Sequence, residues 1–339
     1  MVYSPKKMLV TGGAGFIGSH FVRHCLNSDS DLQVFNLDKL TYAGSKDNLI
    51  NLSDPSRHHF IEADICDKTR IAEVLKKFEI DTIVHFAAES HVDRSITGPE
   101  DFLQTNIIGT YTLLEAARQL WLKEKSWGEK QCRFHHISTD EVFGTLSESD
   151  PAFTETTAYA PNSPYSATKA GSDHLVRAYF HTYGLPVTMT NCSNNYGPFQ
   201  HQEKLIPTII RTCLKGEAIP VYGDGSNIRD WLYVEDHCEA IDTVIRHAKT
   251  GETYNIGGNQ EISNLTLVKM ICHEMDKRSP RAQPHENLIR FVTDRPGHDW
   301  RYAINPQKII HDLQWHPRST LQEGLQKTIA FYCTYTTGQ

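Results

Sequence analysis

Short apolar runs alternate with longer amphipathic stretches over roughly the first 195 residues of the chain. The runs have the length and the β-branched or aromatic content of buried strands, and helical spacing marks the stretches between them. Strands that alternate with helices predict an α/β fold with a doubly wound parallel (Rossmann) sheet and right-handed crossovers. The predicted strands are residues 8–11, 33–37, 59–62, 82–86, 133–138 and 187–190, and the predicted helices are residues 19–26, 70–78, 101–121 and 164–183.

This alternation fades after residue 195, where polar loops and shorter elements follow. A length of 339 residues suits one large domain or two ordinary ones. We therefore predict a Rossmann domain of residues 1–195 and a smaller, mixed α/β C-terminal lobe of residues 196–339. Parts of the chain near residues 230–260 are candidates to return to the first domain.

Charge and hydropathy narrow the class of protein. The chain has 34 Lys and Arg against 41 Asp and Glu, a formal net charge of −7, and it lacks basic runs, which argues against nucleic-acid binding. No apolar stretch approaches the length of a membrane span, and residues 1–7 lack the apolar core of a signal peptide. We expect no membrane association.

The cysteines and histidines show no metal-binding or disulfide pattern. The eight cysteines are scattered without a CxxC pair, which indicates buried thiols in a reducing cytoplasm. The 18 histidines form no pairs with carboxylates at metal-ligand spacing. We expect no structural metal.

A glycine-rich segment follows the first predicted strand. Gly12, Gly15 and Gly18 fit the dinucleotide fingerprint, in which glycines allow a tight turn and a close approach of backbone to pyrophosphate. The next helix presents its N-terminal N–H groups to the phosphates. Asp38 ends the second strand twenty residues past Gly18, where a carboxylate accepts hydrogen bonds from the adenosine ribose and repels a 2′-phosphate. This pattern predicts NAD as the cofactor, although Lys39 leaves NADP open.

Two adjacent acids follow the predicted strand that ends at Ser138. Ligands of open α/β sheets bind beyond the carboxyl ends of the strands, so Asp140 and Glu141 are placed where a substrate would lie. Both can reach one ligand only if the chain turns after Ser138, because a continuing strand points neighbours to opposite faces. Two carboxyls held this close cannot both ionise cheaply, which would supply one acid and one base. The alternative is a pair of solvated loop carboxylates.

Tyr165 and Lys169 lie one turn apart on the next predicted helix. Ser163 is a plausible N-cap with Pro164 at the first helical position, and Gly184 ends the helix. A nearby ammonium favours the phenolate, so we expect Lys169 to lower the pKa of Tyr165. The alternative is a tyrosine that only packs.

Four cations in the C-terminal lobe could hold a diphosphate in this otherwise acidic protein. Each of them, taken singly, could equally form a surface salt bridge. They are Lys204, Arg229, Arg295 and His298.

These motifs resemble those of the extended short-chain dehydrogenase/reductase family. The resemblance rests on the glycine fingerprint, Asp38, the Tyr165/Lys169 pair and the turn at residues 194–197. More narrowly, residues 85–95, 138–144, 229–231 and 294–298 resemble the dTDP-glucose 4,6-dehydratase family, and the likeness runs from residue 8 to about residue 328. Its most specific part is Thr139-Asp140-Glu141, since related epimerases carry a Ser or Thr here without the paired acids.

The resemblance implies roles for individual residues. It implies catalytic roles for Tyr165 as base for hydride abstraction, Lys169 beside it, Asp140 as acid, Glu141 as base and Thr139 as substrate contact. It implies a cofactor site of Gly12, Gly15, Phe16, Ile17, Gly18, Asp38, Lys39, Leu40, Thr41, Asp64, Ile65, Phe86, Ala87, Ala88, Glu89, Thr105, Tyr165, Lys169 and Asn195. It implies a substrate site of Ser90, Thr139, Asn194, Lys204, Leu205, Pro220, Tyr222, Arg229, Asn264, Arg295 and His298.

The implied enzyme is a cytoplasmic, homodimeric lyase that acts on a nucleotide sugar, dTDP-glucose. It oxidises C4 transiently with NAD, eliminates water across C5–C6 and returns the hydride to C6. Thymidine is implied by the resemblance alone, so UDP- and CDP-glucose stay open. The alternatives are an NAD-dependent nucleotide-sugar 4-epimerase and an inactive NAD-binding scaffold. The chain departs from the family at two positions, with Phe143 where Tyr is usual and Thr168 where Ser is usual. Neither position belongs to the proposed acid–base residues.

Overall fold

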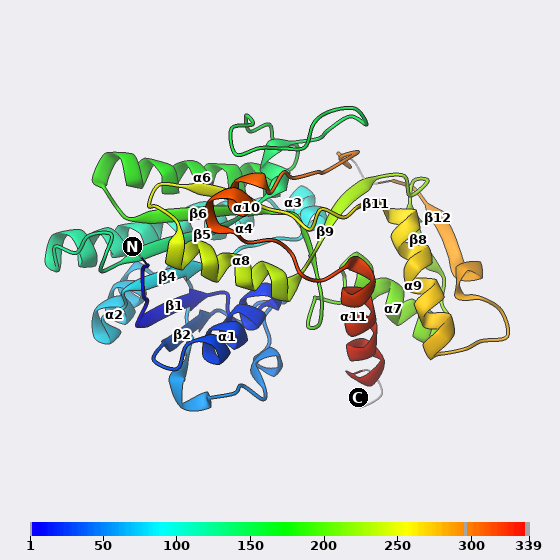
Figure 1. Ribbon diagram of the computed structural model, residues 1–339, viewed down its shortest axis with the longest axis horizontal. Helices are drawn as coiled ribbons and strands as arrows, with labels where there is room; N and C mark the ends of the chain where they lie inside the picture. The colour runs from blue at the N-terminus through cyan, green and yellow to red at the C-terminus, as the bar shows by residue number, and fades with distance from the viewer. Residues whose placement is uncertain (1, 295–296, 336–339) are drawn as a thin grey trace.

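The computed structural model describes residues 2–294 and 297–335. Its centre is a seven-stranded sheet in the order β10-β6-β5-β4-β1-β2-β3, with every neighbouring pair parallel (Figure 1). The strand order reverses between β1 and β4, which is the switch point of a doubly wound sheet and confirms the predicted fold class. The strands are β1 (Lys7–Thr11), β2 (Gln33–Asp38), β3 (His58–Glu62), β4 (Thr82–His85), β5 (Arg133–Thr139), β6 (Val187–Cys192) and β10 (Thr253–Ile256).

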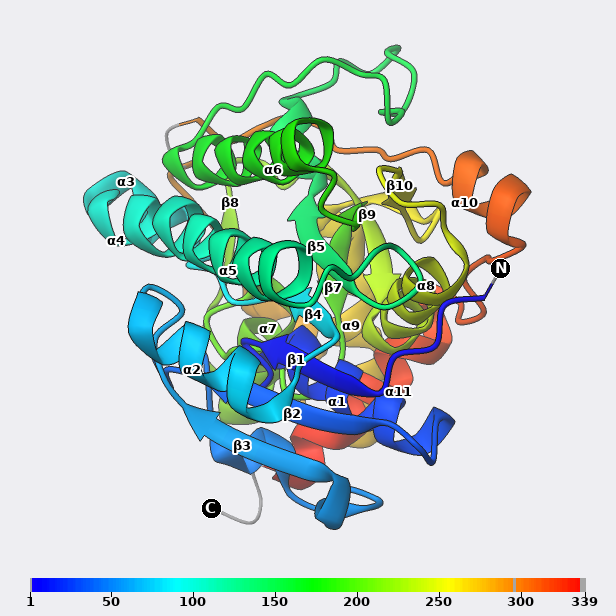
Figure 2. The same cartoon turned by 90° about the vertical axis from the view of Figure 1, so that its left-hand side faces the viewer.

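Helices cover both faces of this sheet. Alternate residues of a strand face opposite ways, and on β1 Met8 and Val10 join the apolar cluster on one face while Leu9 joins the cluster on the other. Figure 2 shows the two helical layers on opposite sides of the sheet. One layer contains α1 (Phe16–Ser28) and α8 (Val234–His247), and the other contains α2 (Lys68–Phe78), α5 (Thr110–Ala117) and α6 (Pro164–Tyr183).

The helix predicted at residues 101–121 is longer than expected and is not α-helical throughout. Two stretches have π-helical hydrogen bonding, and they flank α5 on both sides. Together with the short helices before it, this region forms one rod beside α6. Its parts are α3 (Val92–Thr97), α4 (Glu100–Phe102) and the π-helical turns Leu103–Gly109 and Arg118–Glu124.

A second lobe lies beside the sheet, at the right of Figure 1. It contains a three-stranded sheet, β11-β9-β7, and a two-stranded sheet, β12-β8. Its apolar core includes Ile209, Trp231, Ile271 and Leu325. The elements are β7 (Asn194–Tyr196), α7 (Leu205–Lys215), β8 (Ile219–Tyr222), β9 (Ile228–Tyr233), β11 (Glu261–Ser263), α9 (Asn264–Arg278), β12 (Ile289–Val292) and α11 (Leu321–Tyr335).

The chain passes between the two parts more than once. After β9, α8 packs on α1, and β10 then pairs with β6 at the edge of the main sheet. The short α10 (Gln307–Leu313) packs near β10 before α11 returns to the second lobe. The domain boundary at residue 195 stays a prediction. Within residues 2–294 and 297–335, none of the helices has the length and hydropathy to cross a membrane.

Candidate active site

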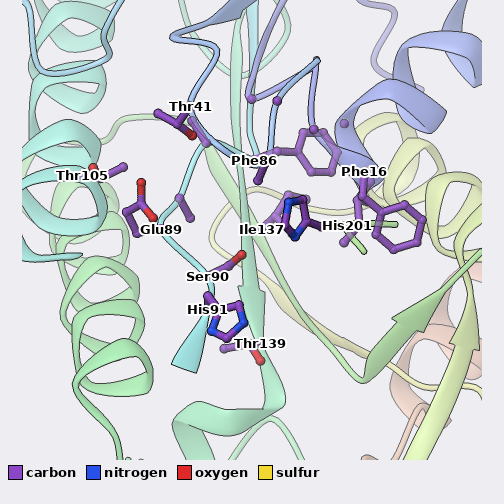
Figure 3. A pocket seen from close by; sticks show the side chains of 18 of the residues that line it. Phe16, Thr41, Phe86, Glu89, Ser90, His91, Thr105, Ile137, Thr139 and His201 are labelled. Atoms are coloured by element: carbon purple, nitrogen blue, oxygen red, sulfur yellow. The ribbon is translucent and has the colours of Figure 1, made fainter. Parts of the chain in front are cut away.

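A cavity of about 600 Å³ opens at the carboxyl ends of the parallel strands. Ligands of open α/β sheets bind at this edge, next to the point where the strand order reverses. The segments that follow β1, β2, β4, β5 and β6 all contribute to its wall. Figure 3 shows Phe16, Thr41, Glu89, Thr105 and Thr139 around the cavity.

The glycine-rich turn after β1 fits the pyrophosphate of a dinucleotide. Gly12 has φ +71°, and a Cβ there would lie 2.7 Å from the backbone nitrogen of Ala87. A Cβ on Gly18 would lie 2.3 Å from the Gly12 carbonyl oxygen, so only glycine lets α1 approach the turn this closely. Gly15 caps α1 without a side-chain hydrogen bond, which leaves first-turn N–H groups available to an anion.

Asp38, at the end of β2, lines the cavity beside the glycine-rich turn. It is buried and accepts hydrogen bonds from the backbone N–H of Ala14 at 2.9 Å and of Leu40 at 2.8 Å. Burial raises the pKa of this carboxyl, and the two N–H groups act against that rise. The neighbouring ammonium of Lys39 pairs with Asp64 at 2.7 Å. The charge that could attract a 2′-phosphate is therefore already paired with a carboxylate. These contacts fit the predicted dinucleotide with a free ribose hydroxyl.

The chain turns at the end of β5, as the paired acids require. β5 ends at Thr139, and a 3₁₀ turn spans Asp140–Phe143. Thr139 Oγ1 accepts the Glu141 N–H at 3.3 Å and caps this turn. Gly144 closes it with φ +92°, where a Cβ would meet the Ala160 carbonyl oxygen at 2.5 Å. Asp140 and Glu141 consequently both line the cavity.

The two acids have different surroundings. Asp140 is 1 % exposed, whereas Glu141 is partly exposed. Burial raises the pKa of Asp140 well above its ordinary value, and the charges of Glu141 and Asp230 raise it further. Its Oδ2 has no hydrogen-bond partner within the described part of the chain. Burial thus favours the protonated form of Asp140, which is the form a general acid needs.

Tyr165 and Lys169 lie on the buried face of α6. Ser163 caps this helix through a capping box with Ser166, Pro164 is its first residue and Gly184 ends it, which confirms the predicted bounds. The Lys169 ammonium donates to the Ile137 carbonyl at 2.7 Å. Burial lowers the pKa of Lys169.

The prediction that Lys169 lowers the pKa of Tyr165 is wrong for this structure. Burial raises the pKa of Tyr165 well above its ordinary value, with further increases from Glu141, Cys192 and Asp140. A side-chain hydrogen bond with Thr139 acts in the opposite direction. Sequence spacing showed the nearby ammonium but not the burial or the facing carboxylates, and these dominate.

Most predicted site residues meet in this one cavity. Every residue of the predicted cofactor set lines it except Leu40, whose N–H binds Asp38 and whose φ is +55°. Asn195 lines it with its amide held in place, because Oδ1 accepts from His237 Nδ1 at 2.9 Å and Nδ2 donates to the Ser193 carbonyl at 3.0 Å. The predicted substrate residues on its wall are Ser90, Thr139, Asn194 and Lys204.

The other predicted substrate residues that the structure describes lie in the second lobe and do not line this cavity. Arg229 is buried, its guanidinium donates to the Asp299 carbonyl at 2.9 Å, and it lies over the Tyr302 ring. His298 contacts Asp294 at 2.6 Å, and its ring lies edge-on to Tyr222. Leu205 begins α7, Pro220 lies on β8 and Asn264 begins α9, while Arg295 lies outside the described residues.

Several wall residues escaped the sequence analysis. Extending the segment after Asp38 by three residues would have found Tyr42 to Gly44, and the polar segment before Lys204 held the signal for Gln200 and His201. Ser138 and His91 lie within segments 138–144 and 85–95, which carry the family resemblance, but neither was listed among the predicted site residues. The missed residues are Leu37, Tyr42, Ala43, Gly44, Ala63, His91, Asp101, Gln104, Ile137, Ser138, Cys192, Ser193, Gln200 and His201.

The sheet, the glycine turn and the Tyr–Lys pair define a dinucleotide-binding enzyme of the short-chain dehydrogenase/reductase class. The family model described as GDP-mannose 4,6 dehydratase matches residues 9–328. The chain belongs to this family of nucleotide-sugar dehydratases and, by the relatives that follow, to its dTDP-glucose 4,6-dehydratases.

Two relatives support this membership across almost the whole chain. The dTDP-glucose 4,6-dehydratase of Shigella flexneri is 54 % identical over 338 residues, which is 97 % of this chain and 93 % of that protein. The crystal structure of the dTDP-glucose 4,6-dehydratase of Streptomyces venezuelae, solved with NAD bound, is 43 % identical with a TM-score of 0.88 and covers 98 % of each chain.

The fold is shared more widely. A UDP-glucose 4-epimerase of Thermotoga maritima has a TM-score of 0.85 at 26 % identity, over 97 % of this chain and 99 % of that one. The fold alone therefore does not separate dehydration from epimerisation.

Proposed function

We propose that this enzyme uses NAD to convert dTDP-glucose to dTDP-4-keto-6-deoxyglucose. The observation that carries the proposal is the capped turn after β5, which brings Asp140 and Glu141 to the wall that Tyr165 shares. The glycine turn and Asp38 line the same cavity, which supports a dinucleotide bound beside the acids. The 54 % identical relative is named for this reaction.

The reaction needs an oxidised C4 before water can leave. A proton on C5 of a hexose is not acidic, but it becomes removable once C4 is a ketone. NAD, when bound, accepts the hydride from C4 and returns it to C6. Tyr165 takes the proton of the C4 hydroxyl.

The paired acids then remove the elements of water. Glu141 takes the C5 proton, and Asp140 gives its proton to the departing C6 hydroxyl, which leaves as water. The unequal burial of the two carboxyls supports this division, since burial favours the protonated form of Asp140. Thr139 caps the turn and contacts the sugar. The double bond that forms is reduced when hydride returns to C6 and a proton returns to C5.

We also propose that cations of the second lobe hold the diphosphate. Lys204 supports this idea directly, because it lines the cavity and its ammonium lies 3.2 Å from the Ser90 carbonyl oxygen. Arg229 lies near the acids, since its charge acts on the pKa of Asp140. Arg295 and His298 complete the proposed set. A binding assay with thymidine diphosphate should show weaker binding in Lys204→Ala.

Product analysis tests the proposed reaction. The protein is incubated separately with dTDP-, UDP- and CDP-glucose, and the products are analysed by mass and by sugar configuration. Loss of one water from dTDP-glucose in preference to the other two supports the proposal. A C4 epimer of unchanged mass would favour the epimerase, and bound NAD without turnover of any sugar would favour the inactive scaffold.

The assembly and the location are also proposals. Ile96, Leu103 and Ile108 are apolar and well exposed on the rod beside α6, and Tyr183 is exposed at the end of α6, which supports a homodimer through these helices. Light scattering should give twice the mass of the 38.5 kDa chain, and Leu103→Asp should weaken the dimer. The eight cysteines carry free thiols, which supports a reducing cytoplasm. Cell fractionation tests this location.

A further inference from the structure

The helical stripe that carries Tyr165 and Lys169 continues to a third buried group. Asp173 lies four residues beyond Lys169 on the 20-residue helix α6, and it is 1 % exposed. Residues four apart lie on one helix face, so the phenol, the ammonium and the carboxylate form one buried line. A buried carboxylate needs partners to offset its lost hydration, and the partners of Asp173 show its role.

One oxygen of Asp173 holds the end of β5. Its Oδ2 accepts hydrogen bonds from the Ser138 hydroxyl at 2.7 Å and from the Tyr159 hydroxyl at 3.0 Å. Ser138 directly precedes the turn that carries Thr139, Asp140 and Glu141. The carboxylate therefore fixes the strand at the residue where the turn begins.

The charge of Asp173 also acts on Lys169. The Lys169 ammonium donates to the carbonyl of Ile137, the residue before Ser138. Burial lowers the pKa of Lys169, and Asp173 is the strongest influence in the opposite direction, followed by Cys192. Burial in turn raises the pKa of Asp173 to about 6, and Lys169 is the strongest influence that lowers it. Each charge helps the other to persist away from water.

The nearest histidine does not take over the role of counter-ion. His136 Nε2 lies 3.1 Å from Asp173 Oδ1, but burial and the Lys169 charge lower the pKa of His136 well below its ordinary value. His136 is therefore neutral. The other titratable groups around this pair are His85 on β4, Tyr159 before α6, Tyr165 and His174 on α6 and Cys192 on β6.

We propose that Asp173 is a positioning residue for the dehydratase, with its carboxylate keeping Lys169 charged and anchoring Ser138 beneath the catalytic turn. The role rests on the proposed function, because the turn and Lys169 serve that reaction. Asp173 is not on the cavity wall and contacts no reacting group. It acts through Ser138, which precedes Thr139 to Glu141, and through Lys169, whose ammonium holds the Ile137 carbonyl on the same strand.

The substitution Asp173→Asn tests the charge and keeps the size. The amide oxygen can still accept from Ser138, but Lys169 loses its buried counter-charge. We expect the pKa of Lys169 to fall by roughly 1–3 units, measured by an NMR titration of isotope-labelled lysine in which Lys169→Arg identifies the signal. We also expect the alkaline limb of the kcat profile on dTDP-glucose to move to lower pH by a similar amount, with KM almost unchanged.

Matched variants separate this role from general support of the fold. Asp242→Asn removes a partly buried carboxylate that pairs with Arg246 at 2.8 Å on α8, and it should lower stability without moving the Lys169 titration. If Asp173→Asn does not fold, Tyr159→Phe removes one donor from outside the cavity and should lower kcat about fivefold, the equivalent of about 1 kcal/mol.

The outcomes distinguish the two proposals. The role of Asp173 is overturned if the Lys169 titration is unchanged in Asp173→Asn. If that variant does not fold, the role is overturned if kcat is unchanged in Tyr159→Phe. A lowered Lys169 pKa in a protein whose wild type forms no 4-keto-6-deoxy sugar supports the electrostatic role and overturns the proposed reaction, since the NMR titration needs no turnover.

Discussion

Arg94 and Glu203 lie 109 residues apart in the chain and meet beside the cavity, where Arg94 Nη2 donates to the two carboxylate oxygens of Glu203 at 3.0 and 3.1 Å. The guanidinium also lies 3.8 Å from the centre of the Tyr42 ring. Tyr42, His91 and His201, which surround this pair, line the cavity, and Figure 3 shows both histidines at its wall. Arg94 thus joins the segment after β2 to the segment before α7.

The substitution Arg94→Ala should speed the release of bound NAD. Both side chains of the ion pair are more than a third exposed, so the pair itself is worth less than about 1 kcal/mol, and the contact with Tyr42 adds about 0.5–1 kcal/mol. A combined loss near 1 kcal/mol corresponds to roughly fivefold faster dissociation. The dissociation rate is measured by dilution of the holoenzyme into excess competing nucleotide. Arg318→Ala, which removes the surface pair with Glu239, is the control. Equal release rates in the two variants would show that the bridge does not retain the cofactor.

Glu141→Gln should stop dehydration without preventing binding. The amide cannot take the C5 proton, and loss of a general base typically costs about 10²–10⁴-fold in kcat. Binding of dTDP-glucose and NAD should stay within a small factor of wild type, as measured by calorimetry. Glu148→Gln changes an exposed carboxylate in the following loop and should leave the rate unchanged. Near-normal dehydration by Glu141→Gln would assign the base role to another residue.

Tyr165→Phe should block the first chemical step. Without the phenol, the C4 hydroxyl keeps its proton and no hydride leaves C4, so rapid-mixing experiments should show no transient absorbance of reduced nicotinamide. Tyr179→Phe on the same helix removes a hydroxyl that donates to Glu115 at 3.1 Å, away from the cavity, and should retain the transient. A normal transient in Tyr165→Phe would mean that another group deprotonates C4.

Local patterns were enough to predict the frame of the site. The apolar runs of the strands, the Ser163 cap of α6 and the glycine turn after β1 are each encoded within a few residues. The structure has all three at the predicted positions. The sequence also showed that a turn after Ser138 was required for Asp140 and Glu141 to act together, and Gly144 closes that turn.

What the sequence could not show depends on contacts between distant segments. The Arg94–Glu203 pair and the hydrogen bond from Ser138 to Asp173 join residues 109 and 35 positions apart. β10 contributes only four residues to the main sheet, too few for a period to predict its partner. The pKa of Tyr165 was predicted with the wrong sign because burial is set by the tertiary structure, and burial outweighs a neighbouring ammonium.

Asp140→Asn should make the protein more stable at neutral pH while it abolishes dehydration. The pKa of Asp140 is raised in the folded protein, so above the ordinary value of 3.8 the unfolded chain loses this proton first, and stability falls as pH rises toward the folded pKa. The asparagine amide does not ionise, so the variant avoids this loss of stability. Urea unfolding should give a higher free energy of unfolding than wild type at neutral pH, and the difference should disappear at acidic pH. The kcat should fall by about 10²–10⁴-fold, because an amide cannot protonate the C6 hydroxyl. Asp150→Asn is the control and should lower stability at neutral pH, because the Ser147 N–H lowers the pKa of this exposed carboxylate in the folded protein. A loss of stability at neutral pH in Asp140→Asn would mean that Asp140 is ionised in the folded enzyme, and the acid of the reaction would then lie elsewhere.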